Sequence, residues 1–271
     1  MAVDIVHWNP RKRRLRGPLG WLLPKHPPVN NFGDLLGPHI VSEIVSRKGI
    51  DFGRDGSDRR LVAVGSIMRM ARDGDVVWGT GVNGKSTALP HEFSNLDVRA
   101  VRGPLTAQFL RDKGIDVPDV YGDPGLLVGW LWPRESFDGT MERSPLTVIP
   151  NLHDVGRYKD HPGFWHPCSP LSQTIARIAT SDFVVGSSLH AVVLADSFGI
   201  GNRLIRSAHE PPFKYEDYYR GTGRASFRMA SDVDEALALG GEELPGWSPD
   251  ELVRAFPWDL WSLAEPTRNL R

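Results

Sequence analysis

The chain has 271 residues, of which 40% are hydrophobic and 24% charged, and its formal net charge is -1. This length allows one large domain or two compact ones, and the balanced charge argues against a nucleic-acid-binding protein, which usually carries a basic excess. The single cysteine, Cys168, excludes an internal disulfide framework and a zinc site built from cysteines.

No stretch of the sequence approaches the roughly 18 apolar residues of a membrane-spanning helix. Residues 1–8 lack the basic and apolar layout of a signal peptide, so we expect a cytoplasmic protein. A basic run at residues 11–16 is followed by the apolar side chains of Leu19, Trp21, Leu22 and Leu23. Such a run is typical of a solvated loop, and the alternatives are a peripheral contact with the inner membrane surface or with an anionic substrate.

The first half of the chain alternates short apolar runs, typical of buried strands, with amphipathic patterns, typical of helices. Pro104 suits a first helical turn because its missing N–H would have no partner there, and Gly114 suits the end of the same helix. The sequence predicts strands at residues 3–8, 61–64, 76–78, 98–101 and 117–121, and helices at 35–45, 104–113 and 125–132.

Residues 133–145 are polar, lack apolar periodicity and are predicted to form a linker. The second half predicts strands at 146–149, 183–185 and 203–205, and helices at 171–179, 189–198, 233–239 and 251–264, the last interrupted at Pro257. Strands that alternate with helices indicate parallel sheets. We therefore expect an α/β fold of two Rossmann-like domains, residues 1–138 and 139–271, that face a cleft. The last helix is expected to pack back across the first domain.

Polar and glycine-rich segments follow the predicted strands at their carboxyl ends, where ligands bind in open α/β sheets. Hydroxyl groups and free backbone N–H groups at a helix start, as at residues 187–190, are suited to an anion. The candidate site residues are Asn31, Asp34, Gly79, Gly81, Arg102, Asp123, His153, Ser187, Ser188 and His190.

Several of these residues also have a structural explanation. Asn31, Asp34 and Asp123 are of the types that cap helices. Arg102 could form a structural ion pair, and His153 could be an incidental loop histidine. The sequence leaves these alternatives open.

Residues 79–86 match the phosphate-binding pattern GxxxxGK[ST] directly after a predicted strand. A true P-loop opens a helix at its lysine, here Lys85. Pro90 and the polar residues after it are a poor continuation for a long helix. We therefore expect no nucleotide site in this segment.

Taken in order, the motifs resemble the polysaccharide pyruvyl transferase family. Two positions depart from the family pattern: Ser188 stands where many members have arginine, and Asn151 stands where some have histidine, with His153 two residues on. The matching segments are Asn31-Phe32-Gly33-Asp34, Trp78-Gly79-Thr80-Gly81, Val101-Arg102-Gly103-Pro104-Leu105-Thr106, Gly122-Asp123-Pro124 and Ser188-Leu189-His190-Ala191, with Ala195-Asp196 a turn later.

The resemblance implies that a pyruvyl group passes from phosphoenolpyruvate to a sugar of a surface or exopolysaccharide glycan, soluble or lipid-linked, within a GT-B-like architecture. It requires no metal or redox cofactor. The implied catalytic residues are His190, Asp123 and Asp34, and the implied substrate-binding residues are Arg102, Ser187, Ser188, Asn31, Gly79, Gly81 and His153. Two alternatives share the expected cleft: a nucleotide-sugar-dependent glycosyltransferase and a non-catalytic glycan-binding protein.

Overall fold

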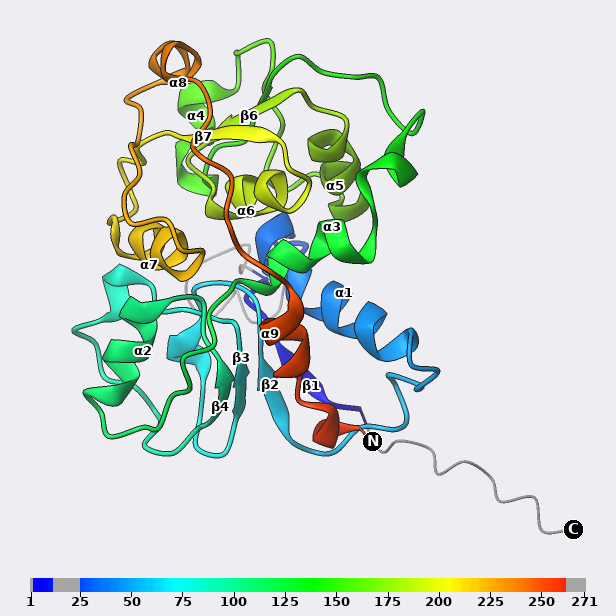
Figure 1. Ribbon diagram of the computed structural model, residues 1–271, viewed down its shortest axis with the longest axis vertical. Helices are drawn as coiled ribbons and strands as arrows, with labels where there is room; N and C mark the ends of the chain where they lie inside the picture. The colour runs from blue at the N-terminus through cyan, green and yellow to red at the C-terminus, as the bar shows by residue number, and fades with distance from the viewer. Residues whose placement is uncertain (1, 12–24, 262–271) are drawn as a thin grey trace, which may run out of the picture.

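The computed structural model describes residues 2–11 and 25–261. Within these ranges the chain forms two separate parallel sheets covered by helices, so the fold is mixed α/β, as the alternation of strands and helices predicts (Figure 1). Most of the basic run, residues 12–16, and the apolar residues 19–23 lie outside the described residues. No described helix is both long enough and apolar enough to span a membrane.

The first sheet has the order β1-β2-β3-β4, and all its strands are parallel. Ile5 of β1 pairs with Leu61 of β2, and Val62 of β2 pairs with Val77 of β3. All four side chains are buried, as expected when both faces of a parallel sheet are covered. The predicted strand at 117–121 is reduced to one bridge between Val101 and Tyr121. The strands are β1 (Asp4–Val6), β2 (Arg60–Val62), β3 (Val76–Trp78) and β4 (Asp97–Ala100).

Helix α1 (Phe32–Ser46) buries Leu36, Ile40 and Ile44, which recur every four residues and so lie on one face. It begins three residues before the predicted start, so that Asp34 belongs to its first turn. Later helices of this half include α2 (Pro104–Arg111), the 3-10 helix η4 (Pro124–Leu127) and α3 (Val128–Leu131).

The second sheet has the order β5-β6-β7 and is also parallel. Its strands are β5 (Thr147–Val148), β6 (Phe183–Gly186) and β7 (Gly201–Leu204). The helices around it are α4 (Val155–Tyr158), α5 (Leu171–Ala179), α6 (Leu189–Ser197) and α8 (Val233–Leu239). The linker predicted at 133–145 contains the 3-10 helix η5 (Arg134–Phe137), and Arg134 donates to the carbonyls of Ala179 and Ser181.

Helix α7 (Phe213–Gly221) is an element that the sequence analysis did not predict. It follows the second sheet in the chain but packs on α2 of the first half (Figure 1). Its apolar periodicity is weak because it buries polar residues, among them Lys214 and Asp217, together with three tyrosines. Helix α7 therefore links the two halves through polar contacts that a hydrophobic pattern cannot reveal.

The last described segment returns to the first sheet, as expected from the sequence (Figure 1). Helix α9 (Asp250–Arg254) places the Leu252 carbonyl 2.9 Å from Nε1 of Trp78, which donates a hydrogen bond to it. The predicted helix at 251–264 is shorter than expected, since α9 ends at Arg254, and within the described residues Pro257 then precedes the 3-10 helix η7 (Trp258–Leu260). The division into domains at residues 138 and 139 stays a prediction, since one hydrophobic core runs from Ile5 to Val184.

Candidate active site

A cavity of about 710 Å³ lies between the carboxyl ends of the two sheets. From the first half it is lined by residues that follow β1, β2 and β3, and from the second by residues that follow β5, β6 and β7. Its lining includes Trp8, Asn31, Asp34, Arg69, Met70, Arg72, Lys85, Leu89, Asn151, His153, Ser188, His190, Glu210 and Lys214. The cavity thus occupies the place where parallel α/β sheets bind ligands.

His190 is the second residue of α6 and lines this cavity. Its ring lies directly against the backbone of Gly33, where a β-carbon would collide with the imidazole. Its Nε2 atom is 3.7 Å from Oδ2 of Asp123, and neither atom has a hydrogen-bond partner among the described residues. Burial lowers the pKa of His190, although the carboxylate of Asp123 acts in the opposite direction. The neutral imidazole, a proton acceptor, is therefore favoured.

Asp123 is fully buried and has two roles in the structure. Its Oδ1 accepts a hydrogen bond of 2.9 Å from the amide of Gly125, which caps η4 as the structural explanation predicts. Its Oδ2 faces His190. The carboxylate is thus fixed by the cap and can stabilise a positive charge that forms on the imidazole.

Asp34 lines the cavity from the first turn of α1. Burial raises the pKa of its carboxyl group to about 6, while the hydrogen bond from Nδ2 of Asn31, at 2.7 Å, acts against the increase. Lys214 and His7 also lower this pKa by their charge. A carboxyl group with a pKa near 6 can donate and accept a proton close to neutral pH.

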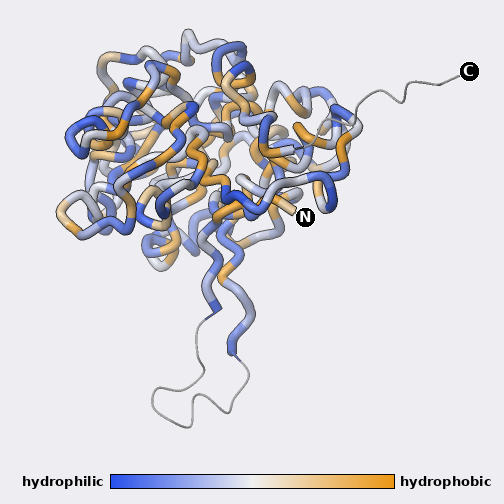
Figure 2. The backbone as a smooth tube through the Cα atoms, turned by 90° about the horizontal axis from the view of Figure 1, so that it is seen from below, coloured by the Kyte–Doolittle hydropathy of each residue, from blue (hydrophilic) through white to orange (hydrophobic). Residues whose placement is uncertain are grey.

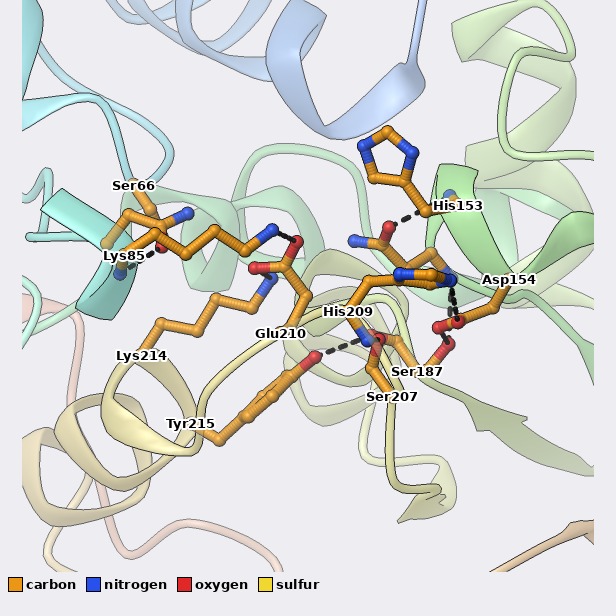
Figure 3. A network of polar contacts seen from close by, with 12 residues as sticks. Ser66, Lys85, His153, Asp154, Ser187, Ser207, His209, Glu210, Lys214 and Tyr215 are labelled. Atoms are coloured by element: carbon orange, nitrogen blue, oxygen red, sulfur yellow. Dashed lines mark hydrogen bonds and ion pairs between the residues drawn. The ribbon is translucent and has the colours of Figure 1, made fainter.

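Two lysines converge on one carboxylate in the same cavity (Figure 3). Nζ of Lys85 lies 2.5 Å from Oε1 of Glu210, and Nζ of Lys214 lies 3.0 Å from Oε2. Burial lowers the pKa of Lys214, while Glu210 raises it. Lys85 belongs to the first half and the other two residues to the second, so the contact crosses the cavity. One carboxylate for two cations leaves a positive excess that suits an anionic ligand.

Glu210 and Lys214 are not among the candidates predicted from the sequence. Both follow the predicted strand at 203–205, so the strand-end rule that selected the other candidates would have included them. Lys85 was considered only as part of the P-loop-like pattern. In the structure only the 3-10 helix η3 (Gly84–Ser86) follows there, in place of the helix that a P-loop opens.

The expectation that Arg102 lines the cleft and holds the donor is wrong. Arg102 has no solvent exposure, and its Nε donates to Oδ2 of Asp217 at 3.0 Å. Its two other nitrogens donate to the hydroxyl of Ser66 and the carbonyl of Val82. Its guanidinium is therefore fully engaged within the protein, and the structural ion pair, the alternative explanation, is the one observed.

Gly79 and Gly81 do not line the cavity, contrary to their assignment as substrate-binding residues. Gly79 has φ of 86° and packs against Pro124, so a side chain is excluded by conformation and by space. Gly81 packs against the guanidinium of Arg102. Both glycines therefore serve the packing beneath the site.

Ser187 is buried in a closed network and is not free to hold an anion (Figure 3). Its hydroxyl donates to Oδ2 of Asp154 at 2.6 Å and accepts from the amide of Asn151 at 2.9 Å. Ser188, in contrast, lines the cavity at the N-terminus of α6, and its side chain makes no capping hydrogen bond. The expected pair of free serine hydroxyls is thus reduced to one.

Asn151, the second departure from the family pattern, lies at the cavity wall beside His153. Asn151 and His153 both line the cavity, and Oδ1 of Asn151 accepts a hydrogen bond of 3.0 Å from the amide of His153. The His153 ring is exposed and lies 5.8 Å from the ring of His209 (Figure 3). Within residues 2–11 and 25–261, no group of three or more His, Cys, Asp or Glu residues is arranged to hold a metal ion.

Residues 31–208 match the model of the family described as polysaccharide pyruvyl transferase. No protein of curated function matches the sequence. A solved structure of a functionally uncharacterized protein from Klebsiella pneumoniae subsp. pneumoniae NTUH-K2044 is similar, with a TM-score of 0.45 and 11% sequence identity. That similarity covers 74% of this chain and 89% of the other. The range matched by the family model contains Asp34, Asp123 and His190 but ends before Glu210 and Lys214.

Proposed function

The chain belongs to the polysaccharide pyruvyl transferase family, and we propose that it transfers a pyruvyl group from phosphoenolpyruvate to a sugar of a surface or exopolysaccharide glycan. The observation that supports this most directly is the convergence of Lys85 and Lys214 on Glu210, in one cavity with the buried imidazole of His190. Such a cavity offers charge for an anionic donor and a group for proton transfer.

The donor would bind to the part of the cavity that the second half of the chain lines. Its phosphate and carboxylate both need cationic or N–H partners, which Lys214 and the free amides at the start of α6 supply. Ser188 adds a hydroxyl group at the same place. In this proposal Lys214 takes the role that the sequence analysis gave to Arg102.

The reaction needs two proton acceptors and one proton donor. A sugar hydroxyl adds to C2 of the donor and loses its proton, while the methylene carbon gains a proton and becomes a methyl group. A second hydroxyl of the same sugar then replaces the phosphate at C2 and loses its proton, which closes the cyclic ketal and releases phosphate. The neutral imidazole of His190 fits the role of the base, and the carboxyl group of Asp34, with a pKa of about 6, fits that of the acid. Asp123 would stabilise the imidazolium that forms.

No metal or redox cofactor takes part in these steps. The same proposal includes a cytoplasmic reaction and an architecture of two Rossmann-like domains, residues 1–138 and 139–271, in the GT-B manner. Two parallel sheets whose carboxyl ends face one cavity support that architecture.

The test is phosphate release from phosphoenolpyruvate in the presence of a panel of soluble and lipid-linked sugar acceptors. We expect acceptor-dependent release that His190→Ala lowers by about 10²–10⁴-fold and that Lys113→Ala, a change outside the cavity, leaves intact. If the protein instead releases a nucleoside diphosphate from a nucleotide sugar and releases no phosphate from phosphoenolpyruvate, it is a glycosyltransferase. Glycan binding without turnover of either donor would identify a binding protein.

A further inference from the structure

Three large apolar side chains that line the cavity are exposed to solvent. Trp8, Met70 and Leu89 are 40%, 36% and 41% exposed, and all three line the cavity. They belong to the segments that follow β1, β2 and β3, three neighbouring strands of the first sheet. The segments that follow these strands therefore expose three apolar side chains on the lining of one cavity, and apolar surface exposed at such a place marks an interaction site.

Two arginines flank these apolar side chains. Arg69 and Arg72 stand on either side of Met70 in the sequence, line the cavity and are exposed. Neither guanidinium has an ion-pair partner among the described residues. Of the acidic residues that line the cavity, Glu92 is exposed, whereas Asp34 and Glu210 are partly buried. We call Trp8, Arg69, Met70, Arg72 and Leu89 the cavity mouth.

Two arms of the chain extend from the body (Figure 2). They begin at Trp8 and Asn31, which both line the cavity, and they pair through the bridge between Arg11 and Pro28. Asn30 is held to the opposite arm, since its amide donates to Oδ1 of Asn9 at 2.9 Å. The arms carry Arg11 and Lys25, so they add positive charge and no acidic residue.

We propose that the cavity mouth docks on the surface of an anionic lipid bilayer. Tryptophan is favoured at the boundary between headgroups and acyl chains, and the side chains of Met70 and Leu89 gain from leaving water there. Arginines beside them remain at the level of the anionic headgroups. A small anion would satisfy Arg69 and Arg72 but would leave the three apolar side chains in water. An anionic bilayer offers headgroups to the two arginines and an apolar interior to the three apolar side chains.

When the cavity mouth lies on the bilayer, the cavity faces the membrane surface. If the proposed pyruvyl transfer is correct, the sugar acceptor is then taken from the membrane surface. Only this consequence rests on the proposed function; the docking itself follows from the mouth residues and can be measured without donor or acceptor.

The test is co-sedimentation of the full chain with phosphatidylcholine vesicles, with and without phosphatidylglycerol. We expect binding to the anionic vesicles, weaker at high ionic strength because salt screens the attraction. Since each basic residue at an anionic surface contributes about a factor of five, replacing two should weaken binding by roughly 30-fold. The double variant Arg69→Gln and Arg72→Gln measures this effect. The triple variant Trp8→Ser, Met70→Ser and Leu89→Ser should lose binding as well.

Matched controls lie elsewhere on the surface. Trp130, Leu237 and Leu244 are 47%, 49% and 45% exposed and lie outside the cavity, so their triple serine variant should bind the vesicles like the wild type. Arg220→Gln with Arg254→Gln gives the corresponding charge control.

Three results with vesicles would overturn the proposal. They are no binding to anionic vesicles, equal binding by the mouth variants and the wild type, or equal losses in mouth and control variants. Binding of inorganic pyrophosphate that depends on Arg69 and Arg72, without vesicle binding, would also overturn it, because the mouth would then be a site for a free anion.

Discussion

Arg102 and Asp217 form an ion pair with no solvent exposure, with 2.9 Å between Nη2 and Oδ2, although 115 residues separate them in the chain. The first residue follows β4 and the second lies on α7. The backbones meet closely there, since a β-carbon on Gly103 would collide with the carbonyl of Asp217, and one on Gly221 with that of Arg102. The pair therefore joins the first sheet to a helix of the second half.

Replacing Arg102 by methionine should destabilise the fold. Asp217 would keep its hydrogen bonds from Thr106 but would be left as a buried carboxylate without a counterion. Removing one partner of a buried pair costs about 3–5 kcal/mol. Urea denaturation should show this decrease in the free energy of unfolding.

A matched control is Arg111→Met, because Arg111 pairs with Asp119 in an exposed position. Its removal should change stability little, since exposed pairs contribute little. If Arg102→Met unfolds like the wild type and only the KM for phosphoenolpyruvate increases, Arg102 binds the donor after all.

Gly33→Ala should lower turnover while leaving the fold intact. Gly33 lies in α1 with an ordinary helical backbone, where alanine is favoured, but its β-carbon would push against the ring of His190. A displaced base should lower kcat by about 10²-fold, measured as phosphate release at saturating donor. Gly156→Ala is the control, since nothing lies within 4 Å of the added carbon. Equal kcat values for both variants would show that the position of His190 does not matter.

The sequence predicted the parallel sheets and three residues that the structure brings to one place, Asp34, Asp123 and His190. The reason is that the strand-end rule depends only on where strands stop, and short apolar runs between polar segments reveal that. The rule gives the position of the backbone, however, and not the direction of the side chain. Arg102 follows β4 as predicted, yet its side chain turns inward because Gly81 leaves room for the guanidinium.

The rest of the site depends on contacts between distant residues. The sequence predicts a free hydroxyl at Ser187, but that hydroxyl donates a hydrogen bond to Asp154, 33 residues away. Lys214 lies on a helix whose inner face is polar, so no apolar period indicated that it is buried. Such pairings are decided by the folded structure, and a single sequence contains no direct sign of them.

Asp34→Asn should stabilise the protein at high pH. Because burial raises the folded-state pKa of Asp34 to about 6, the folded protein holds a proton that the unfolded chain releases near pH 4. Stability is therefore lost as the pH rises from about 4 through 6, and the full penalty of about 2–3 kcal/mol applies above that range.

The asparagine variant has no such penalty and keeps an oxygen to accept from Asn31. It should be more stable than the wild type at pH 8 and equally stable near pH 4, as measured by urea denaturation at both values. Asp160→Asn, at an exposed position, should show no pH-dependent gain. A wild type that is the more stable protein at pH 8 would contradict the raised pKa.

Lys214→Met should impair use of the donor and spare the acceptor. The ammonium group is buried at the cavity wall and shares Glu210 with Lys85. It can therefore bind an anionic ligand while Lys85 stays paired with that carboxylate. Loss of one charge-assisted bond of about 1.5–3 kcal/mol raises the KM for phosphoenolpyruvate by roughly 10- to 100-fold. Lys214→Arg should recover part of the loss, and Lys113→Met should have no effect.

The pH dependence separates this role from a structural one. Burial lowers the pKa of Lys214, so in the wild type the donor KM should rise as the pH increases through that lowered pKa and the ammonium loses its proton. The methionine variant should lack this rise, and its affinity for inorganic phosphate, measured by calorimetry, should be low at every pH. If the variant keeps the pH-dependent rise, or if only the acceptor KM changes, the donor is held by other groups. The shared carboxylate would then serve only to join the two halves.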